Sequence, residues 1–443
     1  MTAISLGTHQ YTSPVIIKRK RPVPVVPVPF LGVTTQRTAA ILTGSDRFGT
    51  VMQFDRSVTG QLVKTEYYDT GLVSNFWMDS NTQGNTALKC VLNPMVTDLT
   101  ITGNADIRDY PWAYTDAWQP PDYNGPDYIH RADGLCLQGS GCVVERVRLT
   151  QIPGTALIIK GGTDVQGGVY GIFDSPVSKI RDVHVSHCVN GIQIDAGDSK
   201  ISGICIDQCC KDGLILNSSG ALYDGTMGHI QGADRAVVVT QQVSMVNCYH
   251  ESARIGTYID TGGLGTSINK LTFGPSTCTY RGLVINTNGV TGTDVGGGVK
   301  SQTEAYPDIT GIEVMAGWVH TTLSGQIEIG AGTGGGNGSK GVIVRGHRGS
   351  FNFKGGWNVS GSGCSFISVK EAVTSTDITI KGNGDGGTAL DLTNSNLNNV
   401  VGKGNLFQVF WDGTAAPVVY PGGGTSYNLA AGTELRVNGQ LQS

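Results

Sequence analysis

The sequence predicts an all-β protein in which short strands recur at a regular spacing and stack as the parallel strands of a solenoid. Three observations support this fold class. Glycine contributes 65 of the 443 residues and charged residues only 15%, which argues against a helical bundle and against a highly charged disordered chain. One short motif recurs along the chain: a turn residue, usually followed by Gly, then apolar-any-apolar and a polar residue. Its repeats follow one another at about 22 residues.

The motif is clearest in the middle of the chain. Its second position is occupied by Gly191, Gly213, Ala236, Gly256 and Gly282, so successive repeats lie 22, 23, 20 and 26 residues apart. Another short strand precedes several of the motifs, as in "VHVSHC" at 183–188 and "ICIDQC" at 204–209. A β-sandwich would instead place strands every ~8–12 residues with hairpin signals between them. The longer period indicates a solenoid in which each repeat stacks on the one before.

A polar residue closes each repeat. In parallel strands about 4.8 Å apart these residues would form a ladder of side-chain hydrogen bonds at one edge. Cys residues ahead of the turns, such as Cys188 and Cys209, would stack inside. The closing residues are Gln138, Asp195, Asn217, Thr240, Asp260 and Asn286.

With these motifs the chain resembles the right-handed parallel β-helix proteins, the broad group that holds pectinases and bacteriophage tailspikes. The resemblance covers roughly residues 90–400, and "VTDLTITGN" at 96–104 looks like an early repeat of such proteins. It is a match at the level of the fold, and a fold alone says little about activity.

The resemblance and the composition divide the chain into four parts. Residues 1–35 form a basic, proline-rich arm, and residues 36–90 form a β region that leads into the helix. The parallel β-helix covers residues 91–400 and carries a long aromatic loop at 104–131. Residues 401–443 form a small C-terminal β cap or a trimerisation segment.

The arm begins with a basic run, Lys18, Arg19, Lys20 and Arg21, followed by prolines at 22, 24, 27 and 29. Such a segment favours an extended polyproline conformation. In the phage proteins that this chain resembles, short N-terminal segments dock into a larger particle, so we expect an anchor. A nuclear-import tag and a disordered tail are the alternatives. Alternating Val and Pro is more apolar than a solvated tail usually is.

The loop at 104–131 concentrates aromatic and acidic residues in a chain with only 7% aromatics. Long loops without secondary structure are uncommon unless they are functional or disordered. Aromatic faces stack on the C–H faces of sugars and carboxylates accept hydrogen bonds from hydroxyl groups, so we expect glycan contact. Plugging the end of the helix or packing on a neighbouring subunit are the alternatives. The candidate residues are Tyr110, Trp112, Tyr114, Trp118, Tyr123, Asp109 and Asp116.

The middle residues of the apolar-any-apolar units face outward, because side chains alternate along a strand. Four successive ones are apolar: Ile215, Val238, Tyr258 and Val284. An exposed apolar stripe usually marks a contact surface. A loop folded over this face is the alternative. Because tailspikes are trimers of such helices, the resemblance implies a homotrimer with these residues at its interface.

The sequence leaves open whether the protein is an enzyme. A glycosidase needs two carboxylates ~5–5.5 Å or ~6.5–9.5 Å apart, a geometry without a sequence signature. Asp195 with Asp198, and Asp234 with Glu251, are the candidate catalytic pairs, although acidic residues at turns are common in any β-solenoid. The Asn-Thr-Asp and Asp-Asp motifs of polygalacturonases are absent, and "GHI" at 228–230 is only a fragment of their Gly-His-Gly.

Other functional classes find little support. The ten cysteines include no CxxC pair, so we expect buried thiols and neither a metal nor a cofactor. No apolar run approaches the roughly 18 residues of a membrane helix. The net charge of -4 gives no reason to expect nucleic acid as a partner. The prolines of the basic N-terminal stretch argue against a signal peptide.

Together these observations predict a bacteriophage virion structural protein of tailspike or tail-fibre type, made in the host cytoplasm. It would contact a host surface glycan or receptor and would bind other virion proteins through its arm. One alternative is a carbohydrate-active enzyme of the same fold, a polysaccharide depolymerase acting as hydrolase or lyase. The other is a purely architectural decoration protein of the virion.

Overall fold

The structure is a computed structural model of the chain, and its described part is all-β, with strands and turns but no helix. None of the described residues forms a helix that could cross a membrane. The chain divides into unit 1, Met1–Cys210 with Asn217–Ala221, and unit 2, Lys211–Leu216 with Leu222–Ser443. The described residues are 2–20, 33–68, 87–103, 132–139, 141–161, 177–273, 281–301, 310–315, 319–331, 340–345, 347–355, 365–369, 377–382, 388–391, 405–411, 418–419, 433–437 and 439–441.

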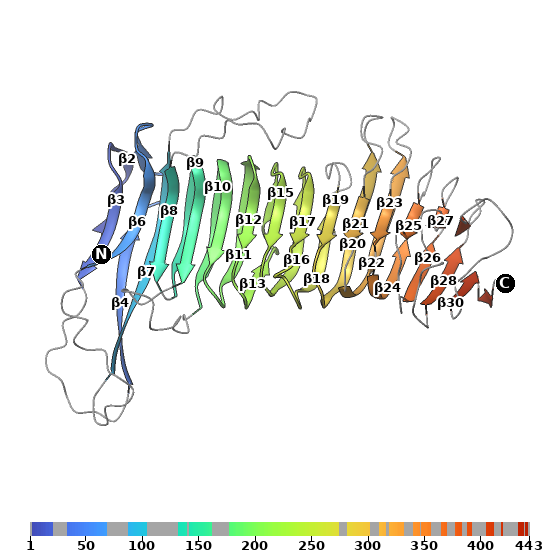
Figure 1. Ribbon diagram of the computed structural model, residues 1–443. Helices are drawn as coiled ribbons and strands as arrows, with labels where there is room; N and C mark the ends of the chain where they lie inside the picture. Colours follow the sequence, from blue (N-terminus) through green and yellow to red (C-terminus); the bar gives the residue numbers. More distant parts are fainter. Residues whose placement is uncertain are drawn as a thin grey trace. The chain divides into compact units, whose positions relative to one another are not determined.

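Unit 1 is built from parallel strands that lie side by side (Figure 1). Their pairing forms three rows. The first row joins β1, β4, β7, β9, β10 and β11, the second joins β2, β5, β7, β9, β10 and β11, and the third joins β3, β6, β8, β9 and β10. The strands are β1 (Thr2–Ala3), β2 (Gly7–Tyr11), β3 (Val15–Lys20), β4 (Val33–Thr43), β5 (Thr50–Phe54), β6 (Gly60–Tyr68), β7 (Ala87–Thr102), β8 (Ala132–Gly139), β9 (Val143–Gly161), β10 (Lys179–Asp195) and β11 (Lys200–Cys209).

Single residues with left-handed backbone bend the long strands of unit 1. Arg146 and Gln151 in β9 have φ of 52° and 54°, and Asp182 and His187 in β10 have φ of 52° and 56°. The strand register aligns Asp182 with Arg146 and His187 with Gln151. Left-handed backbone is uncommon outside glycine, so its repetition at aligned positions marks two corners of the chain. The corners explain how one long strand contributes to three rows.

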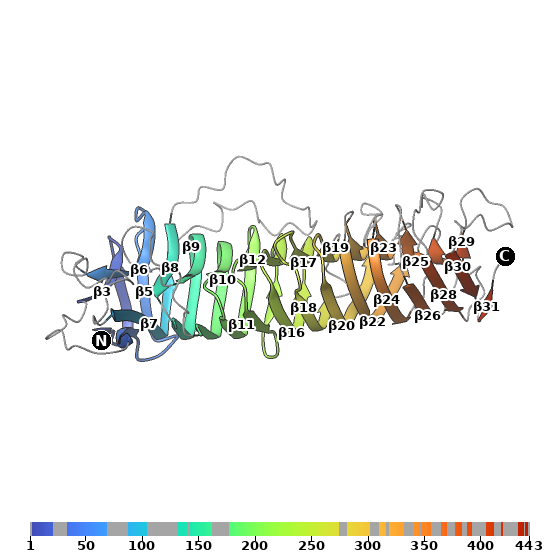
Figure 2. The same cartoon turned by 60° about the horizontal axis from the view of Figure 1, so that its bottom comes forward.

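Unit 2 has two rows of parallel strands, which Figure 2 shows on opposite sides of the unit. Odd-numbered strands from β15 to β29 continue from β12, and even-numbered strands from β14 to β30 form the other row. Within the described residues only β30 and β31 pair antiparallel. The strands are β12 (Asp212–Leu216), β13 (Ala221–Asp224), β14 (His229–Gln231), β15 (Arg235–Val239), β16 (Val243–Glu251), β17 (Ile255–Ile259), β18 (Ser267–Phe273), β19 (Arg281–Ile285), β20 (Val290–Ser301), β21 (Thr310–Val314), β22 (Val319–Ala331), β23 (Lys340–Val344), β24 (His347–Gly355), β25 (Ser365–Val369), β26 (Asp377–Gly382), β27 (Thr388–Asp391), β28 (Asn405–Trp411), β29 (Val418–Val419), β30 (Thr433–Val437) and β31 (Gln440–Leu441).

The glycines of the repeated motif are required by close contact between neighbouring backbones. A Cβ on Gly213 would lie 2.6 Å from the carbonyl oxygen of Ala236, and one on Gly256 would lie 2.3 Å from that of Gly282. The same atom on Gly282 would lie 2.6 Å from the carbonyl oxygen of Gly311. A real Cβ does not tolerate such distances, so the missing side chain lets each strand approach the next.

Inward-facing aliphatic side chains fill the core of each unit. In unit 1, Ile192 and Ile194 are fully buried, and in unit 2 Val237, Ile259 and Leu283 are too. Each such side chain stabilises the fold by about 1.5–3 kcal/mol through removal of apolar surface from water. These residues are the apolar positions of the repeated motif, so the predicted alternation is the one that builds the core.

The predicted stacking of cysteines is also present. Cys188 and Cys209 are neighbours in the register of β10 and β11, and both are buried free thiols. Burial raises the pKa of Cys188 to about 12, so the thiol stays neutral at physiological pH. These residues behave as small apolar side chains.

The parallel strands extend beyond the expected limits of 91–400. β1, β2 and β3 fall within the predicted arm, and β3 pairs with β6 so that Lys18, Arg19 and Lys20 align with Glu66, Tyr67 and Tyr68. The apolar run Val15–Ile17 accounts for this strand, because β-branched residues favour sheet. Arg21 lies outside the described residues. At the other end, β28 and β30 continue the parallel row into 401–443. Whether the N-terminal segment also acts as an anchor stays a prediction.

Candidate functional site

A cluster of hydrogen-bonded polar side chains lies at the end of β10 in unit 1. Gln193 donates from Nε2 to both carboxylate oxygens of Asp195, at 3.0 and 2.8 Å, and Asn217 donates from Nδ2 to one of them at 2.9 Å. The backbone amide of Asn217 also donates to the carbonyl oxygen of Ile194. We call Gln193, Asp195 and Asn217 the Asp195 cluster. It forms one rung of the predicted polar ladder.

A related cluster lies on β15, β17 and the turns that follow β17 and β19 in unit 2. Asn286 Nδ2 lies 3.4 Å from both the hydroxyl of Tyr258 and a carboxylate oxygen of Asp260. The guanidinium of Arg235 lies over the Tyr258 ring, 5.7 Å from its centroid, a cation–π contact. We call Arg235, Tyr258, Asp260 and Asn286 the Tyr258 cluster. It combines an aromatic ring with amide and carboxylate groups.

Arginine–carboxylate pairs flank the Tyr258 cluster. Arg235 donates from Nε and a terminal nitrogen to Asp212 at 2.6 and 2.7 Å. Arg254 makes the same two-point contact with the fully buried Asp234. Such bidentate bonds are the stronger kind of ion pair.

Glu313 accepts hydrogen bonds from two arginines. Arg345 Nε donates to it at 2.8 Å, and Arg281 Nε donates to its other oxygen. Burial raises the pKa of Glu313, but the bonds from Arg345 and Arg281 outweigh burial, so its pKa is lowered overall. Glu313 is therefore ionised at neutral pH and is unsuited to donate a proton.

The four candidate catalytic carboxylates have separate surroundings. Asp195 belongs to the Asp195 cluster, and Asp234 is paired with Arg254. Glu251 accepts a hydrogen bond of 2.6 Å from the hydroxyl of Tyr249. Asp198 has left-handed backbone, φ 51°, and its carboxylate lies against Gly220, where a Cβ would be 2.2 Å from it. Each carboxylate thus has a contact within the fold that accounts for its position. The catalytic roles of the four residues stay predictions.

The candidate interface residues form one outward row in unit 2. Ile215 pairs with Val238, Val238 with Tyr258, and Tyr258 with Val284. Val238 and Val284 are each only 5% exposed. The row is thus continuous, as alternation predicts, but it presents less apolar surface than four outward side chains would suggest. Its contact with another subunit stays a prediction.

The candidate glycan-binding residues of the aromatic loop, Tyr110, Trp112, Tyr114, Trp118, Tyr123, Asp109 and Asp116, lie outside the described residues.

A group on the second row of unit 1 was missed by sequence reasoning. Arg148, His184 and Asp207 point outward there, beside the corner residue His187. The alternation of "VHVSH" at 183–187 marks His184 as outward. Only the strand register, however, shows that residues from three repeats meet.

In the part of the chain that the structure describes, no group of three or more His, Cys, Asp or Glu side chains is arranged to hold a metal ion. Comparison of the sequence with models of known protein families finds no match, and comparison with curated proteins finds none either.

Proposed function

We propose that the protein is a right-handed parallel β-helix that serves as a bacteriophage virion protein of tailspike or tail-fibre type and binds a host surface glycan. The observation that carries the proposal is the strand register. Within each unit, successive repeats pair parallel and in phase, so that polar groups separated by more than 20 residues come together, as Asn217 and Asp195 do. A stack of this kind provides a rigid scaffold with a long lateral surface.

The chemistry of the two clusters supports glycan binding. Sugars offer many hydroxyl groups, which both donate and accept hydrogen bonds, together with apolar C–H faces. The Asp195 cluster supplies amide donors and a carboxylate acceptor, and the Tyr258 cluster adds an aromatic ring. A few polar groups beside an apolar contact are typical of sites that recognise small ligands.

Binding is favoured over cleavage because the carboxylates near the Tyr258 cluster are already hydrogen-bonded by arginines, and the pKa of one of them, Glu313, is lowered by those bonds. Asp212, Asp234 and Glu313 each accept hydrogen bonds from arginine. A glycosidase needs one carboxylic acid that carries a proton at working pH. Depolymerase activity is therefore the second candidate, and an assay for polysaccharide cleavage distinguishes it from binding.

The proposed assembly is a homotrimer that joins other virion proteins through residues 1–35. Supporting the trimer is the continuous outward row Ile215, Val238, Tyr258 and Val284. The basic run at 18–21 supports contact with an acidic surface on the particle.

The experiment uses the full chain. Light scattering measures its mass, and incubation with host surface polysaccharides measures binding and cleavage. A variant with Lys18, Arg19, Lys20 and Arg21 replaced by Ser is compared with it, because deleting the segment would also remove β3. We expect a trimer that binds polysaccharide without shortening it, and a variant that binds equally well but is not incorporated into particles. A monomer that binds no polysaccharide would refute the proposal. Cleavage of the polysaccharide would instead indicate that the protein is a depolymerase.

A further inference from the structure

The second row of unit 1 carries two adjacent columns of outward polar side chains. Arg148 and His184 are neighbours in the register of β9 and β10, and His184 is in turn the neighbour of Cys205 in β11. One outward position further on, Thr150 aligns with Ser186, and Ser186 with Asp207. The intervening side chains, such as Val147, Val183 and Val185, are buried, so these polar groups face away from the core. Neighbouring strands bring them about 4.8 Å apart.

Most of these groups bond to one another. His184 Nε2 lies 3.0 Å from a carboxylate oxygen of Asp207, and Ser186 Oγ donates to Thr150 Oγ1 at 3.0 Å. His187 lies at the corner that follows Ser186. The bond to Asp207 fixes the plane of the His184 ring. The His184 ring and the two hydroxyls thus have defined positions.

Arg148 is the exception. Its Nε is shielded from solvent and has no hydrogen-bond partner among the described residues. A guanidinium is always charged and presents its N–H groups as a planar fork that matches an oxyanion. A buried donor without a partner costs about 1–3 kcal/mol, so the position invites an acceptor from outside the chain.

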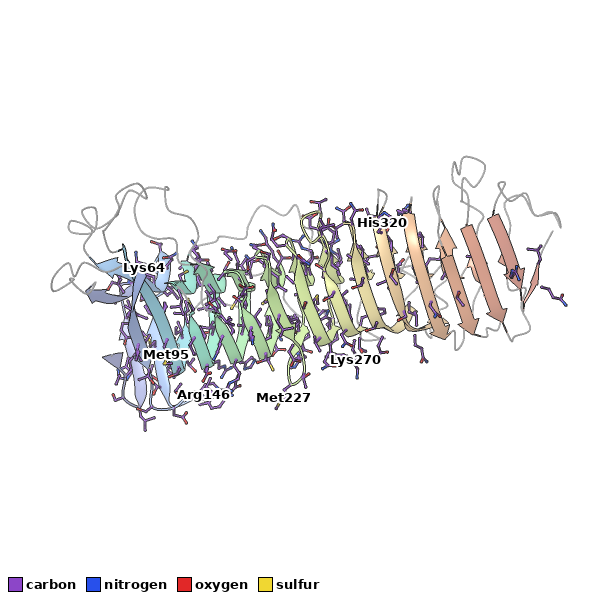
Figure 3. All side chains as sticks on the ribbon, turned by 90° about the horizontal axis from the view of Figure 1, so that it is seen from below. Lys64, Met95, Arg146, Met227, Lys270 and His320 are labelled. Carbon is purple, nitrogen blue, oxygen red and sulfur yellow. The ribbon has the colours of Figure 1, made fainter. Side chains whose placement is uncertain are left out.

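The surrounding carboxylates are engaged elsewhere. Asp98 accepts two hydrogen bonds from Arg146, and Asp182 accepts one from Arg47. Glu145 lies between Arg146 and Arg181, at 3.2 and 3.3 Å. Figure 3 shows Arg146 at the outer surface of unit 1, on the opposite side from Lys64. Among the described residues, these three carboxylates are therefore paired with arginines other than Arg148.

Burial lowers the pKa of His187 below its usual range, and the positive charge of Arg148 acts in the same direction against the opposing influence of Asp207. His187 is thus neutral at pH 7 and offers one donor and one acceptor nitrogen. The site then has the single fixed positive charge of Arg148, balanced in part by Asp207, with neutral hydrogen-bonding groups around it.

We propose that Arg148, His184 and His187 form a subsite for one oxyanion of a ligand, a carboxylate or a sulfate or phosphate ester, with Thr150 and Ser186 contacting adjacent hydroxyl groups. The inference rests on the proposed function, because it takes the ligand to be the glycan that the protein binds. It implies that this glycan carries at least one acidic group in each bound segment.

The test uses the full-length protein and four probes: glucuronate, glucose 6-sulfate, inorganic phosphate and neutral glucose. The ring resonances of the eight histidines are followed by NMR during titration and assigned with His184→Gln and His187→Gln. We expect the resonances of His184 and His187 to shift with at least one anion and not with glucose. The anion that binds most tightly identifies the source of the charge.

Two variants make the test specific. Arg148→Gln should weaken anion binding by about tenfold or more, as expected for loss of a charge-assisted hydrogen bond. Arg181→Gln is the matched control, since Arg181 belongs to the same unit, is 62% exposed and bonds only weakly to Glu145; it should change binding by less than about twofold. A titration that shifts the resonances of neither ring, or equal losses of binding in the two variants, would overturn the proposal.

Failure of the subsite and failure of the proposed function give different results. If small anions bind but host polysaccharide does not, the subsite is supported and the proposed function fails. If polysaccharide binds but no anion does, the proposed function is supported and the subsite fails.

Discussion

Arg148 of unit 1 differs from the arginines of unit 2 in what it contacts. In unit 2, Arg235, Arg254, Arg281 and Arg345 each donate to a carboxylate of the same surface, Asp212, Asp234 or Glu313. In unit 1, Arg148 stands among outward side chains of the same kind of row with its Nε unpaired. The unit 2 arginines therefore stabilise the stack, whereas the arrangement at Arg148 leaves bonding capacity unused. A residue that contributes little to stability at its position is a better candidate for recognition.

The largest effect is expected from the fully buried His250 of unit 2, in contrast to the half-buried His184 of unit 1. Its Nδ1 lies 3.1 Å from Thr257 Oγ1, its Nε2 has no partner among the described residues, and burial lowers its pKa from 6.5 to about 3. Because the unfolded chain binds this proton more readily, stability is full above pH 6.5 and is lost as the pH falls towards 3. The loss over that window should be about 4 kcal/mol. Urea unfolding at several pH values measures it, and His250→Gln should flatten the curve; an unchanged slope in that variant would contradict the assignment.

The next effect concerns the buried ion pair of unit 2. Asp234→Ala leaves Arg254 without its carboxylate and should lower the free energy of unfolding by about 3 kcal/mol. The matched variant is Asp98→Ala in unit 1, whose partner Arg146 is 44% exposed. That loss should be within about 1 kcal/mol, because solvent screens an exposed pair. Equal losses in urea unfolding would show that burial does not distinguish the two pairs.

A sharper form of the comparison replaces an arginine in each unit by methionine. Arg235→Met removes the two hydrogen bonds that Asp212 accepts from Arg235 and should cost about 1–2 kcal/mol. Arg148→Met removes an unsatisfied buried donor and should leave stability unchanged or raise it by up to about 1–3 kcal/mol. Thermal unfolding of both variants measures the difference. A cost at Arg148 as large as that at Arg235 would mean that Arg148 holds the fold together.

The smallest effect is at an exposed turn of unit 2. Met227 has φ 105° and is 90% exposed, and Figure 3 shows it at the tip of a projecting turn. The turn is closed by a bond from the amide of Gly228 to the carbonyl of Gly225, at 3.0 Å. Met227→Gly should stabilise the protein by about 0.5 kcal/mol, because relief of backbone strain outweighs the greater freedom of glycine in the unfolded chain. Met227→Ala keeps the strain and should show no gain in the same thermal unfolding assay.

Sequence periodicity was sufficient to predict the parallel all-β architecture, because the motif that carries it is also the one that pairs and packs. Gly256 and Gly282 stand where neighbouring backbones meet, and Ile192 and Ile194 where the core is. The corners could not be predicted in this way. Arg146 and His187 adopt left-handed backbone, for which their residue types give little warning.

The candidate site was harder to predict for a different reason. Asn217 bonding to Asp195 follows from one repeat step, and the ladder was expected. The partners of Asp234 and Arg148 depend on which side chains of neighbouring repeats reach each other, and a period that varies by several residues does not fix this. The N-terminal strands were not predicted, because the basic run and the prolines that follow Val15–Ile17 favour an extended polyproline arm.

The close approach of backbones at Gly213, Gly256 and Gly282 has an evolutionary consequence. Pairing constrains the two strands of each repeat in unit 2, so the segments between the strands are free to lengthen, shorten and change composition. Such a chain can renew its surface quickly while the stacked strands stay the same. Descent among proteins built in this way would be recorded in the phase of their strands long after the residues themselves had diverged.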